Sequence, residues 1–322
     1  SYILIEPNTN TVIAEFNSNA LIEPASMTKV MTGYVVADQI QNGLISLDDQ
    51  VLVSEKAWKM EGSKMFIEAG KKVSILELLK GIIIQSGNDA SVAIAEYVGG
   101  TEDGFVDLMN SYAGALEMND TYFSNSTGLP DENHATSARD LAKLTAKFIN
   151  NFPNEYALYK EKSFTYNNIK QLNRNKLLWR DETTDGVKTG HTSTAGYCLI
   201  GSAKRGNMRL ITVVAGSDSD NERFLSSQRL LEYGFRFYAT QKYFDVKTSE
   251  DILSTEPGKI GIAENGKAGQ SDPQGAAGAA ARVVAAAVGS RYSRKKVEDL
   301  AGVLLARRRR IVERRRRRTS TH

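Results

Sequence analysis

The sequence predicts a mixed α/β (α+β) fold in which helices flank an antiparallel five-stranded sheet. Two segments near the start of the chain and three between residues 186 and 216 alternate apolar and polar side chains, which is the two-residue period of a strand. The long segments between and after them carry the helical period instead. Strands from both ends of a chain must meet in space, and one antiparallel sheet is the simplest arrangement that pairs all five.

The five strands are predicted from the alternating segments and from the turn residues beside them. They span Tyr2–Glu6, Thr11–Phe16, Gly186–Gly190, Gly196–Ala203 and Met208–Gly216. Pro7-Asn-Thr-Asn10 separates the first two strands, and Lys204-Arg-Gly-Asn207 separates the last two. Both segments are rich in residues that favour turns, so each pair is expected to form a hairpin.

Helices are predicted where apolar residues recur at intervals of three and four. These segments are 25–41, 76–98, 102–118, 137–150 and 222–238. The second is interrupted at Gln85-Ser-Gly-Asn88, where Gly and Asn break the helix and leave side chains exposed in a turn. Ser137 is expected to cap the fourth helix, with Asp140 in the capping-box position.

Composition argues against several kinds of site. Of the 322 residues, 41% are hydrophobic and 25% are charged, which is enough for a sizeable core. Cys198 is the single cysteine, so no internal disulfide is expected, and its apolar surroundings predict a small buried side chain. The three histidines are widely separated, so we expect no metal and no cofactor. His134, in the polar segment Pro130-Asp-Glu-Asn-His134, is expected to be a solvated turn residue.

Charge is distributed unevenly along the chain. Residues 276–322 hold 14 Lys/Arg and 3 Asp/Glu, whereas the 275 residues before them hold 27 and 35. From residue 267 onward the chain is rich in Ala, Gly and Arg and lacks Phe and Trp, which predicts disorder or a lone basic helix. We interpret the change of composition near residue 266 as a frameshift or chimeric junction. No run of eighteen apolar residues occurs, so no membrane span is expected.

Ser26 and Lys29 are the first candidate catalytic pair. They lie three residues apart at the start of a predicted helix, so their side chains are expected to share a face. A serine hydroxyl needs a neighbouring base, and a lysine is such a base when burial or nearby positive charge lowers its pKa. The spacing alone has little weight, because it recurs at Ser293 and Lys296 and an isolated copy is more often a helix cap with a surface lysine.

Two later stretches of the sequence favour a catalytic role for Ser26 and Lys29. Gln85-Ser-Gly-Asn-Asp89 places Ser86, Gly87 and Asn88 in the predicted helix break, and Gly186-Val-Lys-Thr-Gly-His-Thr192 places Lys188 on a predicted strand. Ser-x-x-Lys followed by Ser-x-Asn and Lys-Thr-Gly is typical of penicillin-binding proteins and class A β-lactamases. The middle motif is Ser-Gly-Asn here, not Ser-Asp-Asn. A literal Ser219-Asp-Asn221 follows the Lys-Thr-Gly motif, in the wrong order, and is interpreted as a loop.

With Gln171-Leu-Asn-Arg-Asn175, these motifs make the chain from about Tyr2 to about Ala263 resemble the low-molecular-mass penicillin-binding proteins of the penicillin-binding protein 5 type. These are serine D-alanyl-D-alanine carboxypeptidases. The resemblance implies a β-lactamase/transpeptidase-like fold with the active site in a cleft between the sheet and a helical subdomain. It also implies peptidoglycan pentapeptide stems as substrate and acylation by β-lactams.

Catalytic roles follow from the resemblance and from the requirements of acyl transfer. Ser26 is the expected nucleophile and Lys29 the expected base, while Ser86 and Lys188 relay a proton to the leaving D-alanine. Asn88 is expected to orient the substrate amide. The oxyanion hole is expected to consist of the backbone N–H groups of two residues, Ser26 and His191.

Substrate binding is assigned to the remaining motif residues and to a cation. The expected binding residues are Gly87, Thr189, Gly190, His191 and Thr192. Arg223 is the leading candidate for pairing with the terminal carboxylate of the substrate, although a surface arginine at a helix start is the plain alternative. Arg174 is a weaker candidate of the same kind.

The sequence bears on three alternatives to a carboxypeptidase: a β-lactamase, a transpeptidase or endopeptidase, and a protein without enzymatic activity. A class A β-lactamase activates its deacylating water with a glutamate, and that motif is missing because Tyr159 follows Glu155-Tyr-Ala-Leu158 where Asn is required. Transpeptidase or endopeptidase activity stays open. A protein without enzymatic activity that binds polyanions through its basic tail, and a pseudoenzyme that only binds wall peptides, are disfavoured because every motif residue is intact.

The predicted organisation is a penicillin-binding catalytic domain over 1–240, the start of a small β-rich second domain over 241–266 and the tail over 267–322. The chain starts at Ser1 without a signal peptide. The resemblance implies a periplasmic location or the extracytoplasmic face of a bacterial inner membrane. The basic tail is compatible with peripheral membrane contact, and nucleic acid is disfavoured as a partner.

Overall fold

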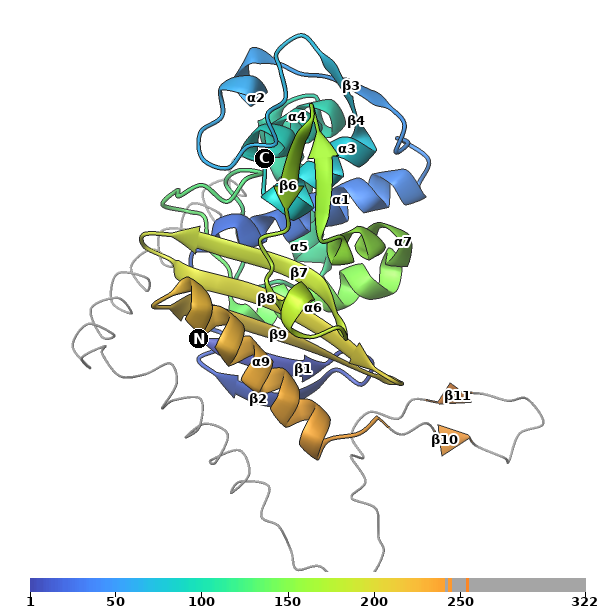
Figure 1. Ribbon diagram of the computed structural model, residues 1–322, viewed down its shortest axis with the longest axis vertical. Coiled ribbons are helices and arrows are strands. Elements are labelled where there is room, and N and C mark those ends of the chain that lie inside the picture. Colours follow the sequence, from blue (N-terminus) through green and yellow to red (C-terminus); the bar gives the residue numbers. More distant parts are fainter. Residues whose placement is uncertain (241–242, 245–252, 255–322) are drawn as a thin grey trace, which may run out of the picture.

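A computed structural model describes residues 1–240, 243–244 and 253–254 of the chain (Figure 1). All of the predicted catalytic domain lies within this part. Of the region predicted to be β-rich, two short strands are described, β10 (Tyr243–Phe244) and β11 (Leu253–Ser254), which pair antiparallel. The predicted tail over 267–322 lies outside the described residues.

The five predicted strands form one antiparallel sheet, as predicted, and the structure gives their order as β2-β1-β9-β8-β7. Their bounds are Tyr2–Glu6 (β1), Thr11–Phe16 (β2), Thr184–Thr192 (β7), Gly196–Arg205 (β8) and Met208–Ser217 (β9). The N-terminal hairpin joins the later strands through β1, which pairs with β9. This order leaves β7, which carries the Lys-Thr-Gly motif, at one edge of the sheet.

Helices cover both faces of the sheet (Figure 1). The helices of the described part include α1 (Lys29–Gln41), α2 (Glu55–Lys59), α3 (Ile75–Lys80), α4 (Asn88–Gly99), α5 (Glu102–Ala115), α6 (Ala138–Asn151) and α9 (Asp220–Phe237). α9 crosses one face against β8 and β9, and α6 packs on the opposite face. α2, α3 and α4 pack together on the β7 side. No helix in the described part of the chain is both long and apolar enough to cross a membrane.

Alternate residues of β1 supply two separate hydrophobic cores. Ile3 and Ile5 belong to the larger core, which also includes α1, α4, α5 and α6. Tyr2 and Leu4 belong to a smaller core beneath α9. Successive side chains of a strand point to opposite faces, so this alternation buries the sheet on both sides.

Two predicted helices are divided in the structure. The helix predicted over 25–41 begins as a 3₁₀ turn, η1 (Ala25–Thr28), and becomes α-helical at Lys29. The break predicted within 76–98 is confirmed, because α3 continues into a π-helical turn, η2 (Gly81–Gln85), before α4 starts. The prediction that the turn exposes its side chains is wrong, since Ser86 and Asn88 are buried.

The predicted cap of α6 is half right. Ser137 accepts the backbone N–H of Asp140 at 3.1 Å, as an N-cap does. The carboxylate of Asp140 accepts instead from the backbone N–H of Asp120 and the hydroxyl of Thr121, so it ties α6 to the preceding loop. A tertiary contact has replaced the capping box.

Several short elements carry no periodic signal in the sequence. They are β3 (Gln50–Leu52), β4 (Lys72–Ser74), β5 (Ser163–Tyr166), β6 (Ile169–Leu172), α7 (Pro153–Tyr156), η3 (Ala157–Lys160) and α8 (Leu177–Arg180). Each has only three or four residues, too few to establish a helical or a two-residue period. The loop interpretation of Ser219-Asp-Asn221 is wrong, because Ser219 caps α9 by accepting the N–H of Glu222 at 3.2 Å.

Gly114 in α5 and Gly234 in α9 give a matched test of how α9 packs. Inside a helix, Ala is favoured over Gly by about 0.5–1 kcal/mol. A Cβ at Gly114 meets nothing within 4 Å, whereas one at Gly234 would lie 2.5 Å from Cδ1 of Leu210 and 3.2 Å from Cδ2 of Leu4. Gly114→Ala should therefore raise the free energy of unfolding, and Gly234→Ala should lower it by about 1–2 kcal/mol, since crowding a core outweighs helix propensity. Urea denaturation measures both, and equal stability of the two variants would contradict the packing.

Candidate active site

Ser26 lies in η1, which packs closely against two glycines. Ala25 has φ +47°, a left-handed conformation that residues with a Cβ rarely adopt. A Cβ at Gly128 would lie 1.8 Å from the carbonyl oxygen of Ala25, and one at Gly190 would lie 3.1 Å from that of Pro24. The last residue of the Lys-Thr-Gly motif is therefore glycine because the edge strand passes directly against the turn that carries Ser26.

Lys29 is completely buried, and its Nζ contacts three oxygen atoms. The distances are 2.7 Å to Oδ1 of Asn88, 2.6 Å to the carbonyl oxygen of Thr127 and 3.4 Å to Oγ of Ser26. A neutral amine has two N–H groups and one lone pair. The amide and carbonyl oxygens have no proton to give, so they take the two N–H groups and leave the lone pair for the Ser26 hydroxyl.

Burial is the main reason that the pKa of Lys29 is lowered, from 10.5 to about 7. The positive charge of Arg174 lowers this pKa further, and the negative charge of Asp89 opposes both effects. A lysine with this pKa is neutral in a large fraction of molecules near pH 7, which is the state that accepts a proton.

Ser86 and Lys188 form a second pair beside the first. Ser86 has φ +66° and lies between η2 and α4, in the predicted break. Nζ of Lys188 donates to Oγ of Ser86 at 2.9 Å and to the carbonyl oxygen of Thr189 at 3.1 Å. Burial holds the pKa of Lys188 well below its usual range, and the charges of Lys29, Arg174 and Arg223 act in the same direction.

Asn88 and Asp89 fasten this turn to the loop over residues 61–67. Nδ2 of Asn88 donates to the carbonyl oxygen of Glu61 at 2.7 Å, so the amide that accepts from Lys29 is fixed from both ends. The buried carboxylate of Asp89 accepts three consecutive backbone N–H groups, those of Met65, Phe66 and Ile67. Gly87 lies between Ser86 and Asn88 in this turn, and a Cβ there would lie 2.8 Å from Oδ1 of Asp89.

The predicted binding residues of the Lys-Thr-Gly strand lie on β7, the edge strand of the sheet. Thr189 is buried, His191 is exposed, and the His191 ring lies 4.1 Å from the ring of Tyr197 on β8. Oγ1 of Thr192 accepts the backbone N–H of Ala195 at 2.9 Å, where β7 turns toward β8. Gly190 lies between them, against η1.

The two candidate arginines differ in their surroundings. Arg223 is not the surface residue of the alternative interpretation, since it is 6% exposed and its Nη1 donates to the carbonyl oxygens of Gly190 at 2.9 Å and Cys198 at 3.2 Å. Arg174 is exposed, and its backbone N–H donates to the carbonyl oxygen of Ile84 at 3.3 Å. Its charge acts on both buried lysines.

The expectation that His134 is a solvated turn residue is wrong. Its side chain is buried, Nδ1 accepts the backbone N–H of Ser124 at 3.2 Å, and Nε2 lies 2.8 Å from Oγ1 of Thr28 in the nucleophile turn. Burial lowers the pKa of His134 to about 4, so the ring is neutral at pH 7 and Nε2 donates to Thr28. Within the described ranges, no three His, Cys, Asp or Glu residues are grouped so as to hold a metal ion.

Comparison with known proteins agrees with this geometry. Residues 1–219 match the peptidase S11 family model, described as D-alanyl-D-alanine carboxypeptidase. The chain belongs to this family. The D-alanyl-D-alanine carboxypeptidase DacC of Escherichia coli is 45% identical over 247 residues, which are 74% of this chain and 62% of that protein. The chain thus spans about three fifths of the length of such curated relatives.

Solved structures of the family have the same fold. Penicillin-binding protein 5 from Haemophilus influenzae is 42% identical with a TM-score of 0.74, over 76% of this chain and 72% of that one. Penicillin-binding protein D2 from Listeria monocytogenes, in a cefotaxime-bound form, is 28% identical with a TM-score of 0.67, over 73% of this chain and 96% of that one. The fold is therefore β-lactamase/transpeptidase-like, as the resemblance implied.

Sequence reasoning overlooked three contributors to the site. The carbonyl oxygen of Thr127 is a backbone atom, and every residue type has one, so the sequence does not show that it contacts Lys29. Asp89 adjoins a motif, yet its partners come from a loop without a periodic pattern. His134 has a polar neighbourhood in sequence, and its burial comes from Thr28 and Ser124, which contact it only in the folded chain.

The pKa of Lys29 gives the first test of the site. The rate at which benzylpenicillin acylates Ser26 should rise with pH and level off above about 7, as Lys29 loses its proton. Lys29→Arg should lower that rate by about 10² or more and remove the rise, because arginine is not deprotonated in proteins. Time courses by intact mass between pH 5 and 9 measure this, with Lys59→Arg on an exposed helix as control. A Lys29→Arg rate within a few-fold of the parent would assign the base elsewhere.

Proposed function

We propose that the chain is a serine D-alanyl-D-alanine carboxypeptidase that removes the terminal D-alanine from peptidoglycan pentapeptide stems through an acyl-enzyme on Ser26. The contact set of Lys29 is the observation that carries the proposal. Two of its contacts are to oxygen atoms that can only accept, and the third is to the hydroxyl that must lose a proton. The names of the relatives support the same activity.

Acylation begins when Oγ of Ser26 attacks the carbonyl carbon of the penultimate D-alanine and its proton passes to Nζ of Lys29. Collapse of the tetrahedral intermediate breaks the peptide C–N bond. Ser86 and Lys188, joined at 2.9 Å, relay the proton held by Lys29 to the leaving amine of the terminal D-alanine, so that Lys29 is neutral again and the pair is restored. Water then hydrolyses the ester, which releases the shortened stem and restores the Ser26 hydroxyl.

The substrate lies along β7 in this proposal. The oxyanion is bound by the backbone N–H groups of Ser26 and His191, and Asn88 orients the amide of the substrate. The terminal carboxylate is received by Thr189, Thr192 and Arg223 at the edge of the sheet. Gly87 and Gly190 let the turn that carries Ser86 and the edge strand pack closely around the site, and Arg174 adds positive charge nearby.

β-Lactamase activity is disfavoured because a base for rapid deacylation is lacking at the expected sequence position. Asp89 is the carboxylate whose charge acts on Lys29, and its oxygens accept backbone N–H groups of the 61–67 loop. A penicilloyl ester on Ser26 should therefore be long-lived. Transpeptidase or endopeptidase activity is the second candidate, supported by a relative named D-alanyl-D-alanine endopeptidase, 30% identical over 239 residues.

Partners and location follow from the same proposal. Peptidoglycan stems and β-lactams are the ligands, and the protein acts in the periplasm or at the extracytoplasmic face of the inner membrane. Residues 1–240 form the catalytic domain. The basic tail is proposed to make peripheral contact with a membrane, and nucleic acid is not proposed as a partner.

Ser26 is tested by covalent labelling. Benzylpenicillin should add one penicilloyl mass to the protein, and Ser26→Ala should abolish both the label and the release of D-alanine from diacetyl-Lys-D-Ala-D-Ala. Ser293→Ala is the matched control, since Ser293 begins the second Ser-x-x-Lys sequence and should be dispensable. A label that survives in Ser26→Ala would overturn the assignment.

A further inference from the structure

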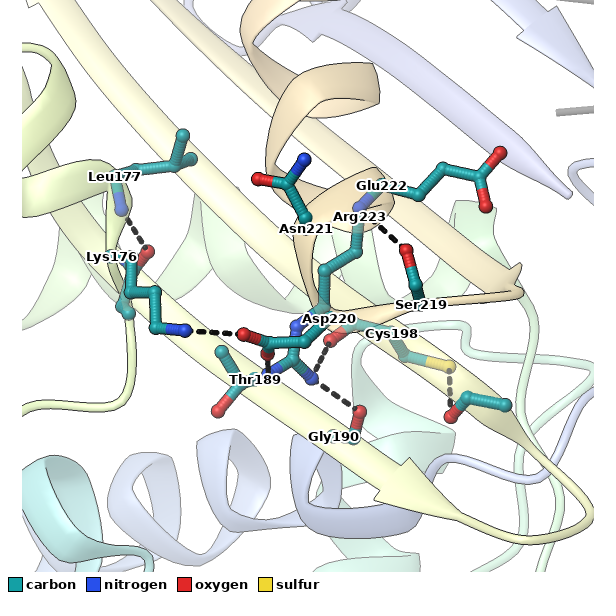
Figure 2. A network of polar contacts seen from close by, with 12 residues as sticks. Lys176, Leu177, Thr189, Gly190, Cys198, Ser219, Asp220, Asn221, Glu222 and Arg223 are labelled. Carbon is teal, nitrogen blue, oxygen red and sulfur yellow. Dashed lines mark hydrogen bonds and ion pairs between the residues drawn. The ribbon is translucent and has the colours of Figure 1, made fainter. Parts of the chain in front are cut away.

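A chain of charged groups runs from α8 to the Lys-Thr-Gly strand (Figure 2). Nζ of Lys176 pairs with Oδ2 of Asp220, and Oδ1 of Asp220 pairs with Nη2 of Arg223. Nη1 of Arg223 then reaches the carbonyl oxygens of Gly190 and Cys198. The network therefore joins α8, the first turn of α9 and the strands β7 and β8.

Burial differs along this chain of charges. The Arg223 side chain is 8% exposed, whereas those of Asp220 and Lys176 are 37% and 57% exposed. Asp220 is thus the partly solvated counter-ion of a buried cation. The net charge of the three side chains is +1, because the negative charge of Asp220 offsets one of the two positive charges.

The guanidinium keeps one N–H group that its neighbours do not use. Arginine has five N–H donors in a fixed plane. Nη1 serves two backbone carbonyl oxygens and Nη2 serves Asp220, so one N–H of Nη2 is left over among the described residues. Nε has no partner there either, but it is buried and closed to a ligand. The carbonyl oxygen of Gly190 belongs to the edge strand, so Arg223 lies directly beside the edge along which the peptide is proposed to bind.

We propose that Asp220 sets the affinity of the site for the terminal carboxylate of the substrate, as the counter-ion that partly neutralises Arg223. This inference rests on the proposed function, in which Arg223 receives that carboxylate. Asp220 does not touch the substrate. It positions the guanidinium and weakens the attraction between its positive charge and a carboxylate. The affinity for the carboxylate is therefore lower than an unpaired arginine would give.

Two substitutions should have opposite effects. Asp220→Asn keeps an oxygen that can accept from Nη2 of Arg223 but removes the negative charge, so the net charge of the network rises to two. Lys176→Met removes the outer positive charge, so the net charge falls to zero. At separations of this kind, near the protein surface, one charge changes the affinity for an anion by about three- to tenfold at low salt.

Glu222→Gln is the matched control. It removes the same charge two residues further along the first turn of α9. The Glu222 carboxylate points away from the guanidinium in Figure 2 and accepts the backbone N–H of Asp218. A change confined to Asp220→Asn therefore reports on the contact with Arg223, not on the charge of the helix start.

The experiment measures binding without chemistry, in the Ser26→Ala background. Dissociation constants of acetyl-D-Ala-D-Ala and of its C-terminal amide are determined by calorimetry at low and high salt. Asp220→Asn should bind the acid about three- to tenfold more tightly and Lys176→Met more weakly, while the amide stays unchanged and high salt reduces both effects. Glu222→Gln should match the parent, and thermal denaturation should show all variants folded.

Two results would overturn the inference. One is an equal change for acid and amide, which would mean that Asp220 only supports the local structure. The other is acid binding by Asp220→Asn that is unchanged or weaker. Hydrolysis of diacetyl-Lys-D-Ala-D-Ala by the protein with Ser26 intact is measured separately, so failure of the proposed activity is distinguished from failure of the charge effect.

Discussion

The active site depends on two lysine ammonium groups buried side by side. Lys29 and Lys188 are at most 2% exposed, and neither forms a salt bridge with any described residue. An ion without water or a counter-ion is costly to bury, and the cost is relieved when the group releases its proton. Burial therefore converts an ordinary cation into the neutral amine that serine activation requires.

The rest of the fold keeps those amines in place. Lys29 is fixed by an amide from α4 and a backbone carbonyl at Thr127, and the α4 turn is itself fastened to the 61–67 loop through Asp89. Lys188 is positioned by the edge strand of a sheet buried on both faces. The site thus forms where three separate parts of the chain meet, and none of them contains it alone.

Much of this arrangement is readable from residue patterns. The five strands follow from two-residue alternation, and the catalytic pairs follow from three motifs that match a family. The sequence does not reveal that Ser26 sits on a 3₁₀ turn, because i, i+3 spacing fits both helix types. It also misplaces His134, since burial by Thr28 and Ser124 is a property of tertiary packing. Residues 219–221 were misassigned because a Ser-Asp-Asn segment suits a loop and a helix start equally well.

The protonation state of Lys29 is the central claim and can be measured directly. In protein labelled with ¹³C at the lysine side chains, the Lys29 signal is identified by its loss in Lys29→Arg and followed as a function of pH. We expect a titration near pH 7, well below the ordinary lysine value of 10.5. A Lys29 signal that titrates at the ordinary lysine value would show that the amine is charged at neutral pH, and it would contradict the role of burial in activating Ser26.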